Sequence, residues 1–393
     1  MTDNLKNSLN RSVPKLSNWC ATMCVALSMT AGGVTAEEAR TGYDGTPRTL
    51  LWSPGPLEFF DAAEFKKEPP YTIGFSNASI SNIWRVGLQH SLQKGIADNK
   101  SLVEKFYITD ANDDPGKQVS DVQDLLERDV DILIVSAATA DALDRIVTSA
   151  MKRGVPVVMV DRRISSDNFV SFVTASDYAL GRFQATWIAE TLGGKGNVIM
   201  LPGGKGASPA EIRLQAAMSV FNQYPGIKVL DTQYTDWSPA KGKTVTSAMI
   251  QRFGDDIDAI WAGSGLQGSG AIEAFVDAGY EDGAIPPVTC GDLNGCVKLA
   301  VQHKIPAMSF DYPPSMGYKS VEIALDVLAG KTVPKIFEIN ADISVSKGHE
   351  TQSVKADRWV EDIAKLDRPN ELILSTGLGD DYDPNTFDAG LGD

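Results

Sequence analysis

The sequence predicts an α/β protein made of two doubly wound parallel-sheet lobes. From Tyr71 onward, short β-rich runs alternate with amphipathic stretches of helix length, which is typical of parallel sheets with helices on both faces. About ten strands are expected, more than one open sheet comfortably holds. We place the break between the lobes after Thr174, because two strand-like runs occur there with almost nothing between them.

The elements follow from hydrophobic periodicity and from the turn residues that separate the runs. The expected strands are Tyr71–Ser76, Lys105–Thr109, Ile132–Ser136, Val155–Asp161, Phe169–Thr174, Asn197–Leu201, Lys228–Gln233, Ala259–Ala262, Pro287–Gly291 and Ala307–Asp311. The expected helices are Ser81–Asp98, Gln118–Arg128, Asp141–Arg153, Tyr178–Leu192, Pro209–Tyr224, Pro239–Phe253, Gly270–Ala278 and Ser315–Ala329.

The first 36 residues differ from the rest of the chain. Basic residues precede an apolar, uncharged stretch rich in small residues, and Val34-Thr-Ala36 resembles a signal-peptidase site. We therefore expect residues 1–36 to be a secretory signal peptide that is cleaved near Ala36. A membrane anchor is the alternative, but Ser, Thr, Asn and Gly dilute the apolar stretch and make it a poor spanning helix.

Composition argues against several classes of function. A net charge of −15 argues against nucleic acid as a partner, since phosphate binding needs a basic face. With 3 histidines and no Cys/His cluster, we expect no metal site. No G-x-S-x-G or H-E-x-x-H motif is present, so we expect no catalytic residue and no cofactor.

Two cysteines, Cys290 and Cys296, would remain after cleavage of the signal peptide. In an exported chain, two cysteines six positions apart suggest a disulfide that closes the small loop CGDLNGC. Two free thiols are the alternative.

Polar and aromatic side chains recur where the expected strands end. Ligands of open α/β sheets bind at the carboxyl ends of the strands, so these side chains are the candidate binding residues. They are Asn82, Trp84, Arg85, Asp161, Arg162, Arg213, Trp237, Asp292 and Asp311. Carboxylates and guanidinium groups can each hold two hydroxyl groups, and tryptophan covers the flat C–H face of a sugar ring. The set therefore indicates a sugar or polyol site, although any single member could be a solvated loop residue or a helix cap.

From about Tyr71 to Val354, the chain resembles the periplasmic sugar-binding proteins of ABC importers, the group that contains the ribose- and galactofuranose-binding proteins. The matching pieces are IGFSNASISNIWR, GVPVVMVDRR, GASPAEIRLQAAM, DIDAIWAGSGLQGSGAIEAFVDAG, TCGDLNG and PPSMGYKSVEIALDVLAGK. The resemblance implies a type I periplasmic binding protein. Its two lobes would be joined by three crossing strands, near Thr174–Ser176, Phe310–Tyr312 and Ile339–Ala341, and ligand would close the cleft between them.

The resemblance also implies roles for the nine candidates. Asn82, Trp84 and Arg85 match the family's first loop, and Asp161 and Arg162 match its Asp-Arg pair. The remaining matches are Arg213 with the arginine of the second lobe, Trp237 with its stacking aromatic, Asp292 with its late aspartate, and Asp311 with its last polar contact. Near Ser264 and Gly265 the sequence departs from the Asn-Asp pair that members usually carry, which puts a polyol contact from this loop in doubt and argues against simple ribose.

The expected domain organisation combines these observations. Its parts are a signal peptide (1–36), an N-terminal extension (37–70), a first lobe (71–175 plus 312–340), a second lobe (176–311 plus 341–354) and an acidic C-terminal extension (355–393).

The expected function is that of an exported, periplasmic solute-binding protein that captures a sugar, polyol or sugar acid and delivers it to the transmembrane subunits of an ABC permease. A chemosensory binding protein that engages a chemoreceptor is one alternative. A secreted carbohydrate-active enzyme with Asp161 and Asp292 as its carboxylates is another. The stretch Gly263-Ser-Gly265-Leu-Gln-Gly268 spells a dinucleotide fingerprint, but it comes too late in the chain to open the first βαβ unit.

Overall fold

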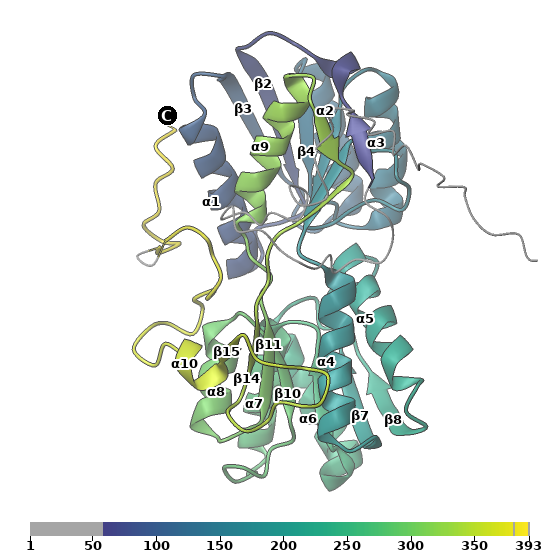
Figure 1. Cartoon of the computed structure of the whole chain (residues 1–393), viewed down its shortest axis with the longest axis vertical. Coiled ribbons are helices and arrows are strands. Elements are labelled where there is room, and N and C mark those ends of the chain that lie inside the picture. The colour runs from purple at the N-terminus through teal and green to yellow at the C-terminus, as the bar shows by residue number, and fades with distance from the viewer. Residues whose placement is uncertain (1–57, 380–381, 392–393) are drawn as a thin grey trace, which may run out of the picture. The chain divides into compact units, whose positions relative to one another are not determined.

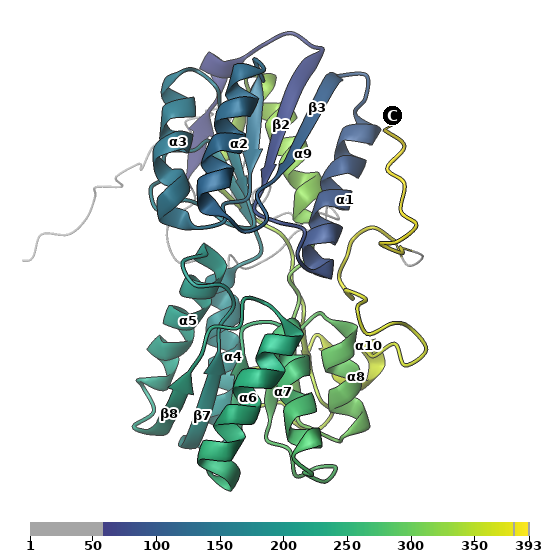
Figure 2. The ribbon, with the colours of Figure 1, turned by 180° about the vertical axis from the view of Figure 1, so that it is seen from behind.

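The computed structural model describes residues 58–379 and 382–391, which belong to one compact unit. Figure 1 and, from behind, Figure 2 show two large β-sheets, each with helices on both faces. This architecture confirms the predicted α/β class with two doubly wound lobes. The predicted signal peptide lies outside the described residues.

The sheet of the first lobe has six parallel strands in the order β13-β6-β5-β4-β2-β3. They are β2 (Tyr71–Asn77), β3 (Val103–Asp110), β4 (Ile132–Val135), β5 (Val157–Val160), β6 (Ser171–Thr174) and β13 (Ile336–Glu338). The helices pack in two pairs, α1 (Ile83–Asp98) with α9 (Met316–Leu328) and α2 (Pro115–Glu127) with α3 (Ala140–Lys152). In β4, Ile132 and Ile134 face the first pair, whereas Leu133 and Val135 face the second. An unbroken apolar run is what a strand buried on both faces requires.

The sheet of the second lobe has seven strands in the order β15-β14-β11-β10-β9-β7-β8, and β14 runs antiparallel to β11. They are β7 (Lys195–Leu201), β8 (Gly226–Thr232), β9 (Ala259–Ala262), β10 (Val288–Gly291), β11 (Ala307–Phe310), β14 (Ile343–Val345) and β15 (Arg358–Trp359). Helices α4 (Asp177–Thr191) and α5 (Ser208–Phe221) pack together on one face. Helices α6 (Pro239–Phe253), α7 (Gly265–Asp277) and α8 (Asn294–Gln302) cover the other face, which is turned to the viewer in Figure 2.

Three segments cross between the lobes. Residues 175–176 lead from β6 to α4, residues 311–315 lead from β11 to α9, and residues 339–342 lead from β13 to β14. All three crossings leave the carboxyl ends of parallel strands, namely β6, β11 and β13, so the carboxyl ends of both sheets lie at the junction of the lobes. This placement brings the strand-end loops of one lobe close to those of the other.

Several expectations about the elements need correction. Five short strands in the described part of the chain were missed, because two or three residues carry no readable periodicity; these are β1 (Phe59–Asp61), β12 (Thr332–Pro334), β13, β14 and β15. Helix α7 begins at Gly265 rather than at Gly270, because Ser264 caps it and accepts a hydrogen bond from the backbone N–H of Leu266.

Both predicted extensions contribute to the folded lobes within the described residues. In the N-terminal one, β1 pairs with β12, and Phe65 of the short 3-10 helix η2 (Ala63–Phe65) joins the core of the first lobe. The C-terminal one supplies β15 to the second sheet and also forms α10 (Val360–Ile363), whose Val360 is buried in the core of that lobe. The second lobe therefore continues beyond residue 354.

Candidate binding site

A cavity of about 50 Å³ lies at the junction of the lobes. Side chains from the carboxyl ends of strands in both sheets line it. They include Asn82, Trp84, Arg85, Asp161, Arg162, Arg213, Trp237 and Asp292 of the predicted set, together with Leu180, Pro209, Ser264, Leu266, Leu293, Phe310, Tyr312 and Ile373. Of the nine predicted binding residues, the structure brings eight to the lining, and Asp311 lies outside it.

Arg85, from the first turn of α1, forms a buried ion pair with Asp161 at the end of β5. Its Nε donates to the carbonyl of Ser79, and its two Nη atoms donate to Asp161, Asn77 and Ser136. Burial, and then the charge of Arg162, lower the pKa of Arg85 to about 10. Because all of its N–H groups have protein acceptors, Arg85 acts mainly by orienting the Asp161 carboxylate.

Arg162 connects the two lobes across the cavity. Its guanidinium carbon lies 4.6 Å from the ring centroid of Trp237, which belongs to the second lobe. The indole rests on the backbone of the β7–α5 loop, where a Cβ at Gly203 would overlap the ring. Arg162 makes one hydrogen bond, of 3.4 Å, to Asp113 and an ion pair of 3.6 Å with Asp161. Within the described part of the chain its other N–H groups have no acceptor, so they are available to a ligand.

Arg213, on α5, forms a second buried ion pair, with Asp177 at the start of α4. Its Nε donates to Asp177 over 2.7 Å and its Nη1 donates to the carbonyl of Gly263 over 2.8 Å. Burial raises the pKa of Asp177 to about 6, although Arg213 opposes the shift. Nη2 of Arg213 has no acceptor among the described residues and remains for a ligand.

Tyr312 lies on a crossing segment and contacts both lobes. Its hydroxyl is within 3.2 Å of Thr174 Oγ1 and within 3.4 Å of the Asp161 carbonyl and of Asp177 Oδ2. The Arg213 guanidinium carbon lies 4.2 Å from the centroid of the Tyr312 ring. Tyr312 is not among the predicted binding residues, because the family resemblance assigned the last polar contact to its neighbour Asp311.

Trp84 and Asn82 shape the same wall from the first lobe. The indole Nε1 of Trp84 donates to the Tyr312 carbonyl over 2.6 Å, and the two rings lie 5.5 Å apart between centroids. Asn82 caps α1, since its Oδ1 accepts a hydrogen bond of 3.1 Å from the backbone N–H of Arg85. Trp84 therefore lines the cavity with its indole held by Tyr312, and the helix uses part of the hydrogen-bonding capacity of Asn82.

Asp292 follows β10 and is buried without a cationic partner. Its carboxylate accepts from the Ser375 hydroxyl and, over 3.3 Å, from the backbone N–H of Tyr312. No lysine or arginine of the described chain lies within 4.0 Å of it. Burial, and then the charge of Asp311, raise the pKa of Asp292 to about 7.

Asp311 is directed away from the cavity. Its carboxylate accepts a hydrogen bond of 2.6 Å from Arg358 of β15, a residue of the C-terminal segment. Burial raises the pKa of Asp311 to about 6, although Arg358 opposes the shift. The ion pair gives Asp311 a structural role between β11 and β15.

The glycine-rich stretch is explained by close packing of α7. A Cβ at Gly265 would come within 2.8 Å of the Leu293 side chain, and one at Gly268 would come within 3.0 Å of Cys296 Sγ. Gly270 packs so closely on the carbonyl of Pro239 that any side chain would collide with it. The glycines therefore let α7 approach α6 and the loop after β10, and this packing explains them without a dinucleotide.

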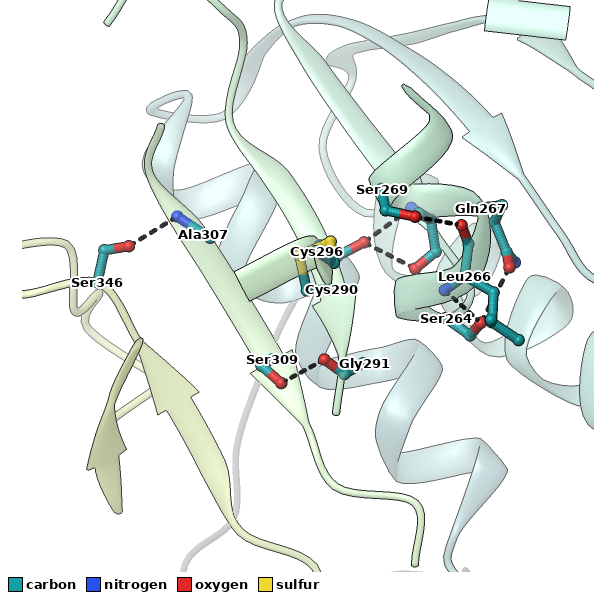
Figure 3. Close-up of a disulfide and its surroundings, with 12 residues drawn as sticks. Ser264, Leu266, Gln267, Ser269, Cys290, Gly291, Cys296, Ala307, Ser309 and Ser346 are labelled. Atoms are coloured by element: carbon teal, nitrogen blue, oxygen red, sulfur yellow. Dashed lines mark hydrogen bonds between the residues drawn. A yellow bond between two sulfur atoms is a disulfide. The ribbon is translucent and has the colours of Figure 1, made fainter. Parts of the chain in front are cut away.

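The structure contains the Cys290–Cys296 disulfide, with 6.0 Å between the two Cα atoms (Figure 3). It joins the end of β10 to the first turn of α8 and closes the loop that carries Asp292. Both cysteines are fully buried in the core of the second lobe.

Sequence reasoning did not predict several residues at or next to the cavity, among them four that contact the predicted binding residues or pack on them. They are Asp177, Tyr312, Ile373 and Ser375. In the sequence, Asp177 looks like an ordinary residue at the start of a helix. The segment that holds Ile373 and Ser375 has no periodicity that would place it beside a strand end. The described residues contain no cluster of three or more potential metal ligands, and none of their helices is long and apolar enough to cross a membrane.

Comparison with known proteins identifies the family. A family model described as a periplasmic binding protein domain matches residues 73–332. The chain is 30% identical over 282 residues to the ribose import binding protein of Bacillus subtilis (strain 168), which covers 72% of this chain and 89% of that protein. It is 33% identical over 207 residues to the xylitol-binding protein of Mycolicibacterium smegmatis, which covers 48% of this chain and 59% of that protein.

A solved structure supports the same assignment. The fructose-binding periplasmic domain of a hybrid two-component system superimposes with a TM-score of 0.65 at 29% identity, over 71% of this chain and 92% of that domain. These matches confirm the resemblance inferred from the sequence, and they confirm the expectation of a binding protein rather than an enzyme. The chain belongs to the periplasmic binding protein family.

Proposed function

We propose that the cavity binds one sugar or polyol of monosaccharide size, which the protein delivers to an ABC-type permease. The observation that carries the proposal is the arrangement of unused hydrogen-bonding groups around the cavity. Arg162 and Arg213 direct N–H groups toward it from opposite lobes, and Asp161 and Asp292 add carboxylates. Trp84 and Trp237 add aromatic side chains to the lining.

This combination suits a polyhydroxy ligand. Each hydroxyl group both donates and accepts, so neighbouring hydroxyls are best held by a guanidinium on one side and a carboxylate on the other. The C–H faces of the ring pack on indole. Each of the three arginines already has a carboxylate partner, so the site favours a neutral ligand over a sugar acid. The pairs are Arg85 with Asp161, Arg162 with Asp113, and Arg213 with Asp177.

The size of the cavity limits the ligand. A cavity needs roughly 10–15 Å³ to hold one water, so about 50 Å³ has room for roughly four waters, equivalent to ~120 Å³ of liquid. That volume suits a small polyol or a single sugar ring, and it leaves no space for an oligosaccharide. The ribose- and xylitol-binding relatives support a ligand of this class.

Family membership supports a periplasmic location, and we propose that the signal peptide is cleaved near Ala36 to release the protein there. In that compartment the Cys290–Cys296 disulfide would persist. The import function of the ribose-binding relative supports an ABC permease as partner. A chemoreceptor is a second candidate partner, since the fructose-binding neighbour belongs to a two-component system.

The proposal is tested by a thermal-shift screen of the full-length exported protein against pentoses, hexoses, polyols and sugar acids. The best compounds are then titrated by calorimetry, and each mixture is analysed for products. We expect saturable one-to-one binding of a neutral compound and no conversion. A screen without any binder, or the appearance of a product, would refute the proposal.

A further inference from the structure

We propose that the C-terminal strap, defined as residues 365–379 and 382–391, is a built-in wall of the binding cleft that sets its ligand specificity and ties the two lobes together. In Figure 1 the strap is the yellow trace that leaves α10 and runs toward α1. The inference rests on the proposed function, because it concerns the shape of the same cleft.

The strap is anchored on the second lobe through the loop that carries Asp292. The side chain of Asn294, which is fully buried, accepts a hydrogen bond of 2.9 Å from the backbone N–H of Lys365 and donates over 2.9 Å to the Lys365 and Pro369 carbonyls. Backbone bonds continue the contact, from Asn294 N–H to Leu372 over 2.8 Å and from Leu374 N–H to Asp292 over 2.7 Å. The strap therefore holds this loop as a neighbouring strand would.

Two strap residues reach the cavity or its polar lining. Ile373 lines the cavity, is only 5% exposed, and packs with Leu266 and Leu293 of the second lobe and with Trp84 of the first. Two positions later, the Ser375 hydroxyl donates to Asp292 Oδ2. Ile373 thus limits the space for a ligand, and Ser375 occupies one of the two oxygens that Asp292 could offer to it.

The far end of the strap contacts the first lobe. The Tyr382 hydroxyl lies 3.0 Å from Nδ1 of His90 on α1, and the Phe387 ring stacks on the same imidazole at 4.7 Å between centroids. Tyr382 is 8% exposed, so this contact is a buried one. Since the other end is bonded to the second lobe, widening the cleft must stretch the strap or detach one of these contacts.

The strap lies outside the part of the chain that matches the family model, which ends at residue 332. The wall formed by Ile373 and the bond from Ser375 therefore come from a segment beyond the matched residues. They give this protein a means of selecting its ligand that adds to the side chains of the strand-end loops.

The tie between the lobes is tested without ligand, by small-angle scattering on the full-length exported protein. Tyr382→Ala combined with Phe387→Ala removes the contact with His90. We expect a larger radius of gyration than in the parent, because the cleft can then open further. Leu366→Ala is the matched control, since Leu366 is in the same segment but 60% exposed, and it should leave the radius unchanged. An unchanged radius in the double variant would overturn the tie.

The wall is tested by calorimetry with D-ribose, D-galactose, D-fructose, xylitol and myo-inositol as probes. Ile373→Trp should weaken binding of the tightest parent ligand at least tenfold, and Ile373→Ala should change the order of preference toward larger probes. Ile373→Val, which keeps most of the side chain, should bind as the parent does. If the parent binds and the Trp and Ala variants match it, the wall is refuted while the proposed function stands. If the parent binds none of these probes, the best compounds of the thermal-shift screen replace them. If that screen finds no binder either, the proposed function fails, and the scattering result still decides whether the strap ties the lobes.

Discussion

Arg85, Arg162 and Arg213 look equivalent in the sequence but have different surroundings. Arg85 donates all its N–H groups to the protein, whereas Arg162 is held by a stacking contact and by one long hydrogen bond to an exposed aspartate. We expect Arg162→Ala to weaken ligand binding by roughly tenfold to a hundredfold, the loss of a charge-assisted hydrogen bond, with little change in melting temperature. Calorimetry and thermal denaturation measure the two effects.

Arg85→Ala is the contrasting variant. It leaves the Asp161 carboxylate buried without its closest cation, so the free energy of unfolding should fall by about 3–5 kcal/mol. Parent-like binding by Arg162→Ala would remove Arg162 from the site, and parent-like stability of Arg85→Ala would contradict the supporting role assigned to Arg85.

Asp292 makes the stability of the ligand-free protein depend on pH. Its pKa is about 7 in the folded protein and roughly 3.9 in an unfolded chain. Between these pH values the folded state holds a proton that the unfolded state has released, so the free energy of unfolding falls as the pH rises. The stabilisation from the protonated Asp292 carboxyl group is therefore full below pH ~4 and is lost as the pH rises through about 7. We expect Asp292→Asn to raise the melting temperature at pH 8, where burial of the carboxylate is most costly, and to raise it less at pH 5.

Thermal denaturation at the two pH values measures this difference. Asp167→Asn serves as the control, because the side chain of Asp167 is 78% exposed. An equal effect of Asp292→Asn at both pH values would mean that Asp292 titrates normally.

Residue types at strand ends were enough to predict most of the polar and charged side chains that line the cavity, because parallel strands bring their carboxyl ends to one edge. Asp311 shows where this reasoning stops. Asp311 and Tyr312 are neighbours on a crossing segment, and the direction of each side chain depends on backbone turns that no local pattern records. The structure turns Tyr312 into the cavity and pairs Asp311 with Arg358.

Among the elements, the loop between β10 and α8 is constrained twice. The disulfide closes it, and the strap bonds to its backbone. The chain-entropy model gives a ring of this size a stabilisation of only roughly 2 kcal/mol. Its larger effect should be to present Asp292 already oriented, which spares the ligand an ordering cost.

We therefore expect Cys290→Ala combined with Cys296→Ala to weaken ligand binding several-fold and to lower the melting temperature only modestly. Alanine is preferred to serine because both sites are fully buried, and the hydroxyl group of a serine there would have no water as a hydrogen-bond partner. Mass spectrometry without reductant first establishes that the exported parent is bonded. Two free thiols there, or unchanged binding by the double variant, would contradict the prediction.

Helix α7 illustrates how far elements could be predicted from the sequence. Three of the seven residues from Ser264 to Gly270 are glycine, which has a poor helix propensity, so local propensity places the start of the helix too late. In the folded protein the helix nevertheless begins at Gly265, because it packs against α6 and Leu293 through contacts that only glycine fits. The short strands were missed because two or three residues carry no readable periodicity, and only pairing with other strands defines them.

At the scale of the whole molecule, alternation of strands and helices predicted both lobes, and the family resemblance implied their crossings. The C-terminal segment could not be placed in this way. Its contacts with Asn294, Asp292 and His90 are single side-chain and backbone bonds to residues far away along the chain, and such contacts leave no periodic pattern.

We expect the lobes to move about the segment that carries Tyr312 as ligand binds. Its hydroxyl contacts Thr174 and Asp177, and its backbone contacts Trp84 and Asp292, so it joins both lobes at the cavity. A cavity of about 50 Å³ bounded by both lobes must widen before a sugar can enter. A ligand that bridges Arg162 and Arg213 then favours the closed form by the difference between its affinities for the closed and open forms.

We expect the radius of gyration from small-angle scattering to fall when the parent is saturated with the best compound of the screen. Arg162→Ala is the matched control, because at the same ligand concentration it should remain largely unbound and keep the radius of the ligand-free protein. An unchanged radius for the saturated parent would show that the ligand enters without movement of the lobes, and the contacts of Tyr312 would then be a fixed part of the junction.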